Sequence, residues 1–156
     1  MDKKVLEAGK EIKKYVRDNQ YSLINHLFKD MIYEITYNNT EINATYLDVL
    51  KVFLANGMDV NMVDEDNNLV VIEDVLEKCF DLKYFDYLMG KNIDLNIINR
   101  YGDTILDRIE QLCMNAYEHI NEAVMDFELT NEEKYDFYKN LVLLLKAYDA
   151  KCSFEI

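Results

Sequence analysis

Apolar residues recur along most of the chain at steps of three and four residues, which is the spacing of one face of an α-helix. The pattern is most regular between Gln20 and Ile35 and predicts a buried helix face there. Similar patterns predict helices over 2–17, 44–56, 69–79, 82–89, 105–124 and from Thr130 onward. The sequence therefore predicts an all-α fold, with Leu6, Leu23, Cys113 and Tyr117 among the inward-facing residues.

One part of this pattern occurs twice. Residues 53–61 end an apolar helical run and continue into an Asp-x-Asn loop, and residues 88–96 do the same 35 positions later. The simplest interpretation is a structural repeat. Two unrelated helix-turn-helix segments that share an Asp-x-Asn loop are the alternative.

The turns of the two copies can be compared residue by residue. Gly57 in the first copy matches Asn92 in the second, and Asn67 matches Gly102. Glycine and asparagine are the residues that most readily accept a positive φ. The exchanges therefore predict one turn geometry, used in both copies.

Three segments have the spacing of a capping box, in which a Ser or Thr before a helix is followed three residues later by an acidic residue. These segments predict helix starts. They are Thr45 with Asp48, Thr104 with Asp107, and Thr130 with Glu133.

The repeated unit resembles the ankyrin repeat, which has a period of about 33 residues. The resemblance is carried by Phe53-Leu54-x-x-Gly57-x-Asp59-x-Asn61-x-x-Asp64 and Asp94-x-Asn96-x-x-Asn99-x-x-Gly102-x-Thr104-x-Leu106. The family's Thr-Pro-Leu-His motif survives only as Thr104-Ile105-Leu106-Asp107, and the chain has no proline. The resemblance implies a divergent ankyrin-like helical-repeat solenoid in a single domain, 1–156. An N-terminal capping helix would cover 1–19, the repeat core 20–113, and a C-terminal cap 114–156.

The length and composition fit one domain with a substantial core, since 50% of the 156 residues are apolar or aromatic. No run reaches the 18 or so apolar residues that a membrane span needs, and the N-terminus has no apolar signal core. We therefore expect a cytoplasmic protein that does not contact membranes.

The chain is strongly acidic, with a formal net charge of -13. We do not expect the chain to bind nucleic acid, because such binding depends on Lys and Arg side chains that neutralise phosphates. The acidic residues concentrate in 59–81 and 118–136, and such zones can steer association with a basic protein. An acidic surface that only keeps the protein in solution is the alternative.

No sequence motif indicates catalysis, a cofactor or a metal site. The chain has two histidines, and its three cysteines, Cys79, Cys113 and Cys152, include no close pair. A calcium loop starting at Asp64 would need Gly and a carboxylate where Leu69 and Val75 stand. We expect no catalytic residue, no cofactor and no metal, so an enzyme is the least favoured class.

The sequence therefore favours a non-catalytic protein-protein interaction module. An acidic inhibitor or immunity-type protein that binds a basic partner fits the charge, and a structural or self-assembling repeat protein is the alternative. We expect a monomer or a weak homodimer. The candidate partner-binding residues lie at the tips of the repeat turns: Glu65, Asp66, Asn67, Asn99, Arg100 and Tyr101.

Overall fold

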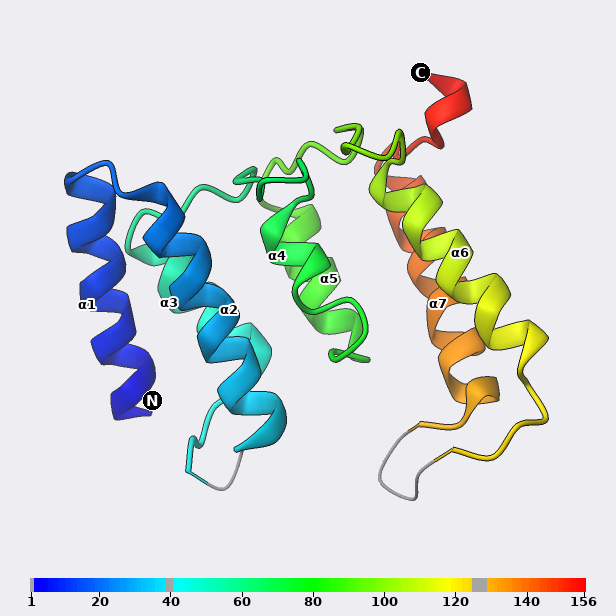
Figure 1. Ribbon diagram of the computed structural model, residues 1–156, viewed down its shortest axis with the longest axis horizontal. Helices are drawn as coiled ribbons and strands as arrows, with labels where there is room; N and C mark the ends of the chain where they lie inside the picture. Colours follow the sequence, from blue (N-terminus) through cyan, green and yellow to red (C-terminus); the bar gives the residue numbers. More distant parts are fainter. Residues whose placement is uncertain (1, 39–40, 125–128) are drawn as a thin grey trace. The chain divides into compact units, whose positions relative to one another are not determined.

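The computed structural model describes residues 2–38, 41–124 and 129–156, and these residues form helices and no β-strand (Figure 1). An isolated antiparallel bridge joins Val63 and Leu69. The all-α fold class is therefore confirmed. The helices are α1 (Lys3–Arg17), α2 (Tyr21–Tyr37), α3 (Tyr46–Ala55), α4 (Val70–Glu73), α5 (Leu82–Met89), α6 (Ile105–Glu118), α7 (Asn131–Ala147) and a final 3₁₀ turn, Ser153–Glu155.

The predicted capping boxes are all present at helix starts. The threonine side chain accepts a hydrogen bond from the third helical amide, and the acidic side chain accepts one from the threonine amide. Each box supplies partners for two amides that the first turn of a helix leaves without one. These boxes begin α3, α6 and α7.

The matched turn positions adopt the predicted backbone conformation. Gly57 and Asn92 have φ of 105° and 57°, and Asn67 and Gly102 have φ of 63° and 84°. The Asp-x-Asn loops also agree, because the amide of Asn61 donates to the Asp59 carboxylate (2.9 Å) and the corresponding bond in the second copy is 3.0 Å. The predicted positive φ is therefore confirmed at all four matched positions, although Gly57 directly follows the C-cap of α3 and Asn92 lies two residues after the C-cap of α5.

Helices α1 and α7 end in the same way as α3 ends at Gly57. Residues with positive φ, Asn19 and Asp149, follow α1 and α7. The amide after each of them donates to a carbonyl five residues back, as does Met58 after Gly57 (3.1 Å). This Schellman arrangement provides donors for carbonyls that a helix end leaves unpaired.

The chain divides into two compact units, and the first comprises the residues up to Glu65 together with Leu69–Cys79. In it, α1 packs against α2 and α3. Phe28 of α2 meets Phe53 of α3 edge to face, with ring centroids 5.6 Å apart, and both are fully buried. Gly9 lets α1 approach α3 closely, because a Cβ there would lie 2.6 Å from a methyl group of Val52.

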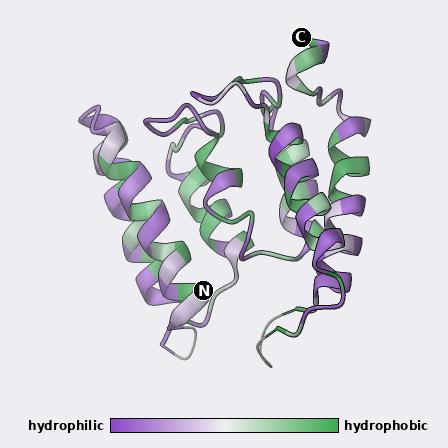
Figure 2. Cartoon of the chain, turned by 45° about the vertical axis from the view of Figure 1, so that its right-hand side comes forward, coloured by the Kyte–Doolittle hydropathy of each residue, from purple (hydrophilic) through white to green (hydrophobic). Residues whose placement is uncertain are grey.

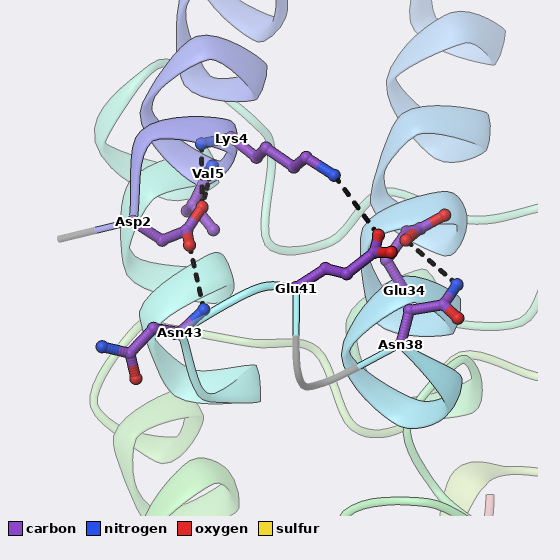
Figure 3. A network of polar contacts seen from close by, with 7 residues as sticks. All are labelled: Asp2, Lys4, Val5, Glu34, Asn38, Glu41 and Asn43. Atoms are coloured by element: carbon purple, nitrogen blue, oxygen red, sulfur yellow. Dashed lines mark hydrogen bonds and ion pairs between the residues drawn. The ribbon is translucent and has the colours of Figure 1, made fainter.

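A polar network fixes the start of α1 within this unit (Figure 3). The Asp2 carboxylate accepts hydrogen bonds from the amides of Lys4 (2.8 Å) and Asn43 (2.9 Å). The bond from Asn43 is the main reason why the pKa of Asp2 is lowered. Lys4 also pairs with Glu41, at 3.8 Å.

The second unit comprises Asp66–Asn68 and Phe80–Ile156. Here α6 packs along α7, and α5 also contacts α7. Aromatic rings form much of the core, because Phe137 lies 5.3 Å from Phe80 and 6.0 Å from Phe85, between ring centroids. Figure 2 shows hydrophobic residues beside hydrophilic ones on the helices, as expected for elements that bury one face.

The segment after α7 is anchored to the start of α6. The hydroxyl of Thr104, which is 1% exposed, donates to the Lys151 carbonyl at 2.6 Å. The Asp107 carboxylate accepts from the Ser153 amide (3.0 Å), and Asn96 accepts from the Lys151 amide (2.9 Å). Thr104 and Asp107 therefore both cap α6 and hold the C-terminal segment.

The predicted extent of two helices is wrong. The expected helix over 105–124 ends at Glu118. The His119 carbonyl accepts the Glu122 amide in a tighter turn (3.0 Å) and also the side-chain amide of Asn131, the first residue of α7 (2.7 Å). The expected helix over 69–79 is α-helical only over Val70–Glu73, and three-residue turns follow it.

Some predicted inward-facing residues are not buried. Leu6 is 46% exposed, Leu23 39% and Tyr117 59%, and Cys113 is half-buried. These residues lie at the margins of their apolar stripes, and burial at a margin depends on which neighbouring element covers it. Among the described helices, none is both long enough and apolar enough to cross a membrane.

Candidate functional site

The structure joins two of the predicted turn tips within the second unit. Residues 66–68 and 98–101, which we call the loop pair, are linked by hydrogen bonds across 31 to 34 positions of sequence. The Asn67 side chain donates to the Ile98 carbonyl (2.9 Å), and the Asn99 side chain donates to the Asn68 side chain (2.9 Å). Arg100 donates its amide to the Asp66 carbonyl (2.8 Å) and its guanidinium to the Asp66 carboxylate (3.2 Å).

Asn99 shapes the second of these loops. Its side-chain oxygen accepts hydrogen bonds from the amides of Tyr101 (2.9 Å) and Asp103 (3.0 Å). Gly102 then follows with a positive φ, which permits the tight return toward α6. Asparagine side chains commonly close turns in this way.

The six candidate partner-binding residues differ in what their side chains do. Glu65, Asn67, Arg100 and Tyr101 are exposed, and Tyr101 is the most exposed of them at 69%. Asp66 and Asn99 are half-buried because they hold the loops together. The Arg100 guanidinium lies 5.9 Å from the centre of the Tyr101 ring. The loop pair thus exposes an aromatic ring, a guanidinium and an amide group on two loops that hydrogen bonds hold together.

Glu65 belongs to the first unit, where it lines an acidic pocket of about 180 Å³ with Asp64, Asp74, His26 and Lys29. Burial raises the pKa of the Asp74 carboxyl to about 6; Lys29 and Lys78 oppose this rise, and Asp64 and Glu73 add to it. Near neutral pH this carboxylate is therefore poorly solvated. A cationic group that entered the pocket would compensate for that lost solvation.

The raised pKa of Asp74 predicts a measurable effect on stability. The folded chain holds this proton more tightly than the unfolded chain, so the stability that Asp74 contributes is complete below pH 3.8 and is lost as the pH rises through about 6. We expect Asp74→Asn to raise the free energy of unfolding at neutral pH by about 1 kcal/mol, a value that already allows for solvent screening of this partly buried group. Urea unfolding of both proteins across this pH range measures the effect.

The exposed Asp30 on α2 provides the matched control. Asp30→Asn makes the same chemical change at an exposed site, so it measures the effect of losing a carboxylate without burial. A loss of stability in Asp74→Asn at neutral pH would refute the explanation by burial.

Two cysteines and one histidine have a raised pKa. Burial and the neighbouring Glu110 raise the pKa of the Cys152 thiol to about 12, and burial raises the pKa of Cys113. Both thiols are therefore protonated near neutral pH and are poor nucleophiles. His119 lies 2.8 Å from the exposed Glu122, and this hydrogen bond raises the pKa of His119. Within residues 2–38, 41–124 and 129–156, no three His, Cys, Asp or Glu side chains are arranged to hold a metal ion.

Sequence reasoning missed one surface feature. Met114 and Tyr117 of α6 and Leu143 of α7 are 63%, 59% and 66% exposed, although their positions belong to apolar helical patterns. The signal was present as a second apolar stripe: Met114 and Tyr117 lie three residues apart on α6, on a different side from the buried Ile109 and Ala116.

The chain matches no protein-family model, no curated protein and no solved structure.

Proposed function

We propose that the chain is a divergent ankyrin-like helical-repeat protein that binds another protein through its turns and performs no chemistry itself. The observation that carries this proposal is the loop pair. Two turns, 31 to 34 positions apart in sequence, are hydrogen-bonded to each other and leave Asn67, Arg100 and Tyr101 exposed. Such a surface is already ordered, so a partner bears little of the entropic cost of ordering it.

The repeat itself supports the ankyrin-like assignment. The two Asp-x-Asn loops share their hydrogen bond, and the matched Gly and Asn residues share positive φ. The departure from the family lies in the first helix of the second copy, where α4 has only four residues. A solenoid with irregular helices accommodates this difference, because each repeat contacts only its neighbours.

The charge favours a basic protein as the partner, and an inhibitor or immunity-type role follows from the pairing of an acidic binder with a basic target. The net charge is -13, and Glu65 lies beside Asp64 in the acidic pocket of the first unit. Complementary charge increases the rate of encounter more than it increases affinity. Binding should therefore form faster at low ionic strength.

Affinity purification from cells of the native host tests this function. The tagged chain should recover a basic protein, and Tyr101→Ser should reduce that recovery by roughly tenfold, as expected for an interface aromatic side chain. Tyr33→Ser is the matched control, because Tyr33 is a 54% exposed tyrosine on α2, outside the loop pair. Recovery of no basic protein, or equal recovery by both variants, would refute the proposal.

A further inference from the structure

A solvent-open groove of about 560 Å³ runs between α6 and α7 in the second unit. Its lining is mostly apolar and comprises Cys113, Met114, Tyr117, Tyr135, Val142 and Leu143, with Glu110 and Lys139 beside them. No described residue covers Met114 or Leu143, which are 63% and 66% exposed. Contiguous exposed apolar surface of this kind marks interaction sites in soluble proteins.

Both walls of the groove are held in place. Capping boxes fix the starts of α6 and α7, and the two helices pack along each other. At one end, the rings of Tyr117 and Tyr135 lie 5.3 Å apart, and at the other Lys146 pairs with Glu110 at 3.7 Å. The groove therefore exists before any ligand binds. Two antiparallel helices with an apolar furrow between them offer the surface on which a third helix packs.

One end of the groove is acidic. A smaller pocket of about 240 Å³ adjoins it, shares Glu110 and Met114 with it, and includes Asp103 and Asp107. The Asp107 carboxylate accepts hydrogen bonds from the amides of Thr104 and Ser153. The Asp103 carboxylate, in contrast, makes no hydrogen bond or ion pair with the described residues. Unpaired negative charge is thus available at this end.

The cations near the groove already have partners. Lys139 lies 3.5 Å from Asp136 and 4.5 Å from the centre of the Tyr135 ring, and Lys146 pairs with Glu110. The charge that remains for an incoming group is therefore negative. A second copy of this acidic chain would place like charges together, which opposes self-association.

We infer that this groove binds an amphipathic α-helix of a partner protein. The apolar face of that helix covers Met114, Tyr117 and Leu143, and a Lys or Arg at its end pairs with Asp103. The inference takes from the proposed function only that the partner is a protein. It uses residues other than the loop pair, so the two can be tested separately.

The test uses two synthetic 18-residue helical peptides with leucines at three- and four-residue spacing. One carries lysines in its last turn and the other carries glutamates at the same positions. Each peptide is titrated into the full ¹⁵N-labelled chain at low salt, with affinity measured by calorimetry. We expect the lysine peptide to bind at least about tenfold more tightly, and its amide shift changes to lie on α6, α7 and the segment before α6.

Variants identify the residues responsible. Leu143→Glu should lower the affinity for the lysine peptide by roughly 30-fold, as expected for a central apolar contact. Met114→Glu should also lower this affinity. Leu6→Glu is the matched control, because Leu6 is an exposed leucine on α1. Asp103→Asn should weaken binding about threefold at low salt and less at high salt. Thermal unfolding confirms that each variant is folded.

Several results would overturn the inference. They are equal affinity for the two peptides, no binding of either peptide, or an affinity for the lysine peptide that is the same in Leu143→Glu, Met114→Glu and the wild type. A wild-type dimer in light scattering that Leu143→Glu converts to a monomer would show instead that a second copy occupies the groove. None of these results depends on a cell extract, so failure here leaves the affinity purification and the role of Tyr101 standing.

Discussion

Replacing Gly57 with valine is expected to lower the free energy of unfolding by about 2–4 kcal/mol. Gly57 has φ of 105°, a conformation that β-branched residues strongly resist. A Cβ at this position would also lie 3.2 Å from a methyl group of Val16 on α1. Because this turn ends α3, the strain would act where α1 and α3 pack together. Chemical denaturation of the wild type and the variant measures the loss.

Two further substitutions separate backbone strain from a general effect of side-chain size. Gly57→Asn places at this turn the residue that its match, Asn92, already uses, so it should cost less than half as much as valine. Gly90→Ala should cost less than about 0.5 kcal/mol, because Gly90 has a negative φ of -81° and its nearest neighbour would lie 3.6 Å away. A Gly57→Val protein as stable as the wild type would contradict the assigned turn geometry.

Thr104→Val is expected to lower the free energy of unfolding by about 2–3 kcal/mol. Valine has nearly the same shape as threonine, so the loss would come from polar contacts alone. The Lys151 carbonyl would lose its 2.6 Å hydrogen bond, and the Asp107 amide would lose the hydroxyl that caps α6. Amide hydrogen exchange should also rise at Lys151 and Ser153, since the C-terminal segment would be held less tightly.

Thr130→Val is the matched control for this second prediction. Thr130 has the same capping box at the start of α7, but it is exposed, and among the described residues its hydroxyl contacts only Glu133. We expect a loss of about 1 kcal/mol there, the usual value for a helix cap. Equal losses for the two variants would mean that the bond from Thr104 to Lys151 contributes nothing beyond capping.

The features that could be predicted from sequence are local ones. Capping boxes need only two residues three positions apart, and all three predicted boxes are present. The positive φ of Gly57, Asn67, Asn92 and Gly102 follows from residue type and position in the repeat. These backbone conformations depend on a few neighbouring residues, so they can be predicted from a single sequence.

The features that were missed depend on distant parts of the chain. At the end of α6, the His119 carbonyl accepts a hydrogen bond from Asn131, 12 residues further along the chain. The contacts of the turn tips could not be predicted for the same reason, because the bonds that join Asp66 to Arg100 and Asn99 to Asn68 connect residues at least 31 positions apart. Periodicity also marks Met114 and Tyr117 as apolar helix positions, but it cannot say whether another element covers them.

The equivalence of the two turns is the claim on which the ankyrin-like assignment and the binding surface both depend. Nuclear magnetic resonance of the isotope-labelled chain tests it directly, through couplings and intraresidue distances that report the sign of φ. We predict positive φ at Gly57 and Asn92 and again at Asn67 and Gly102. A negative φ at either asparagine would contradict the shared geometry and remove the basis for placing the loop pair at the binding surface.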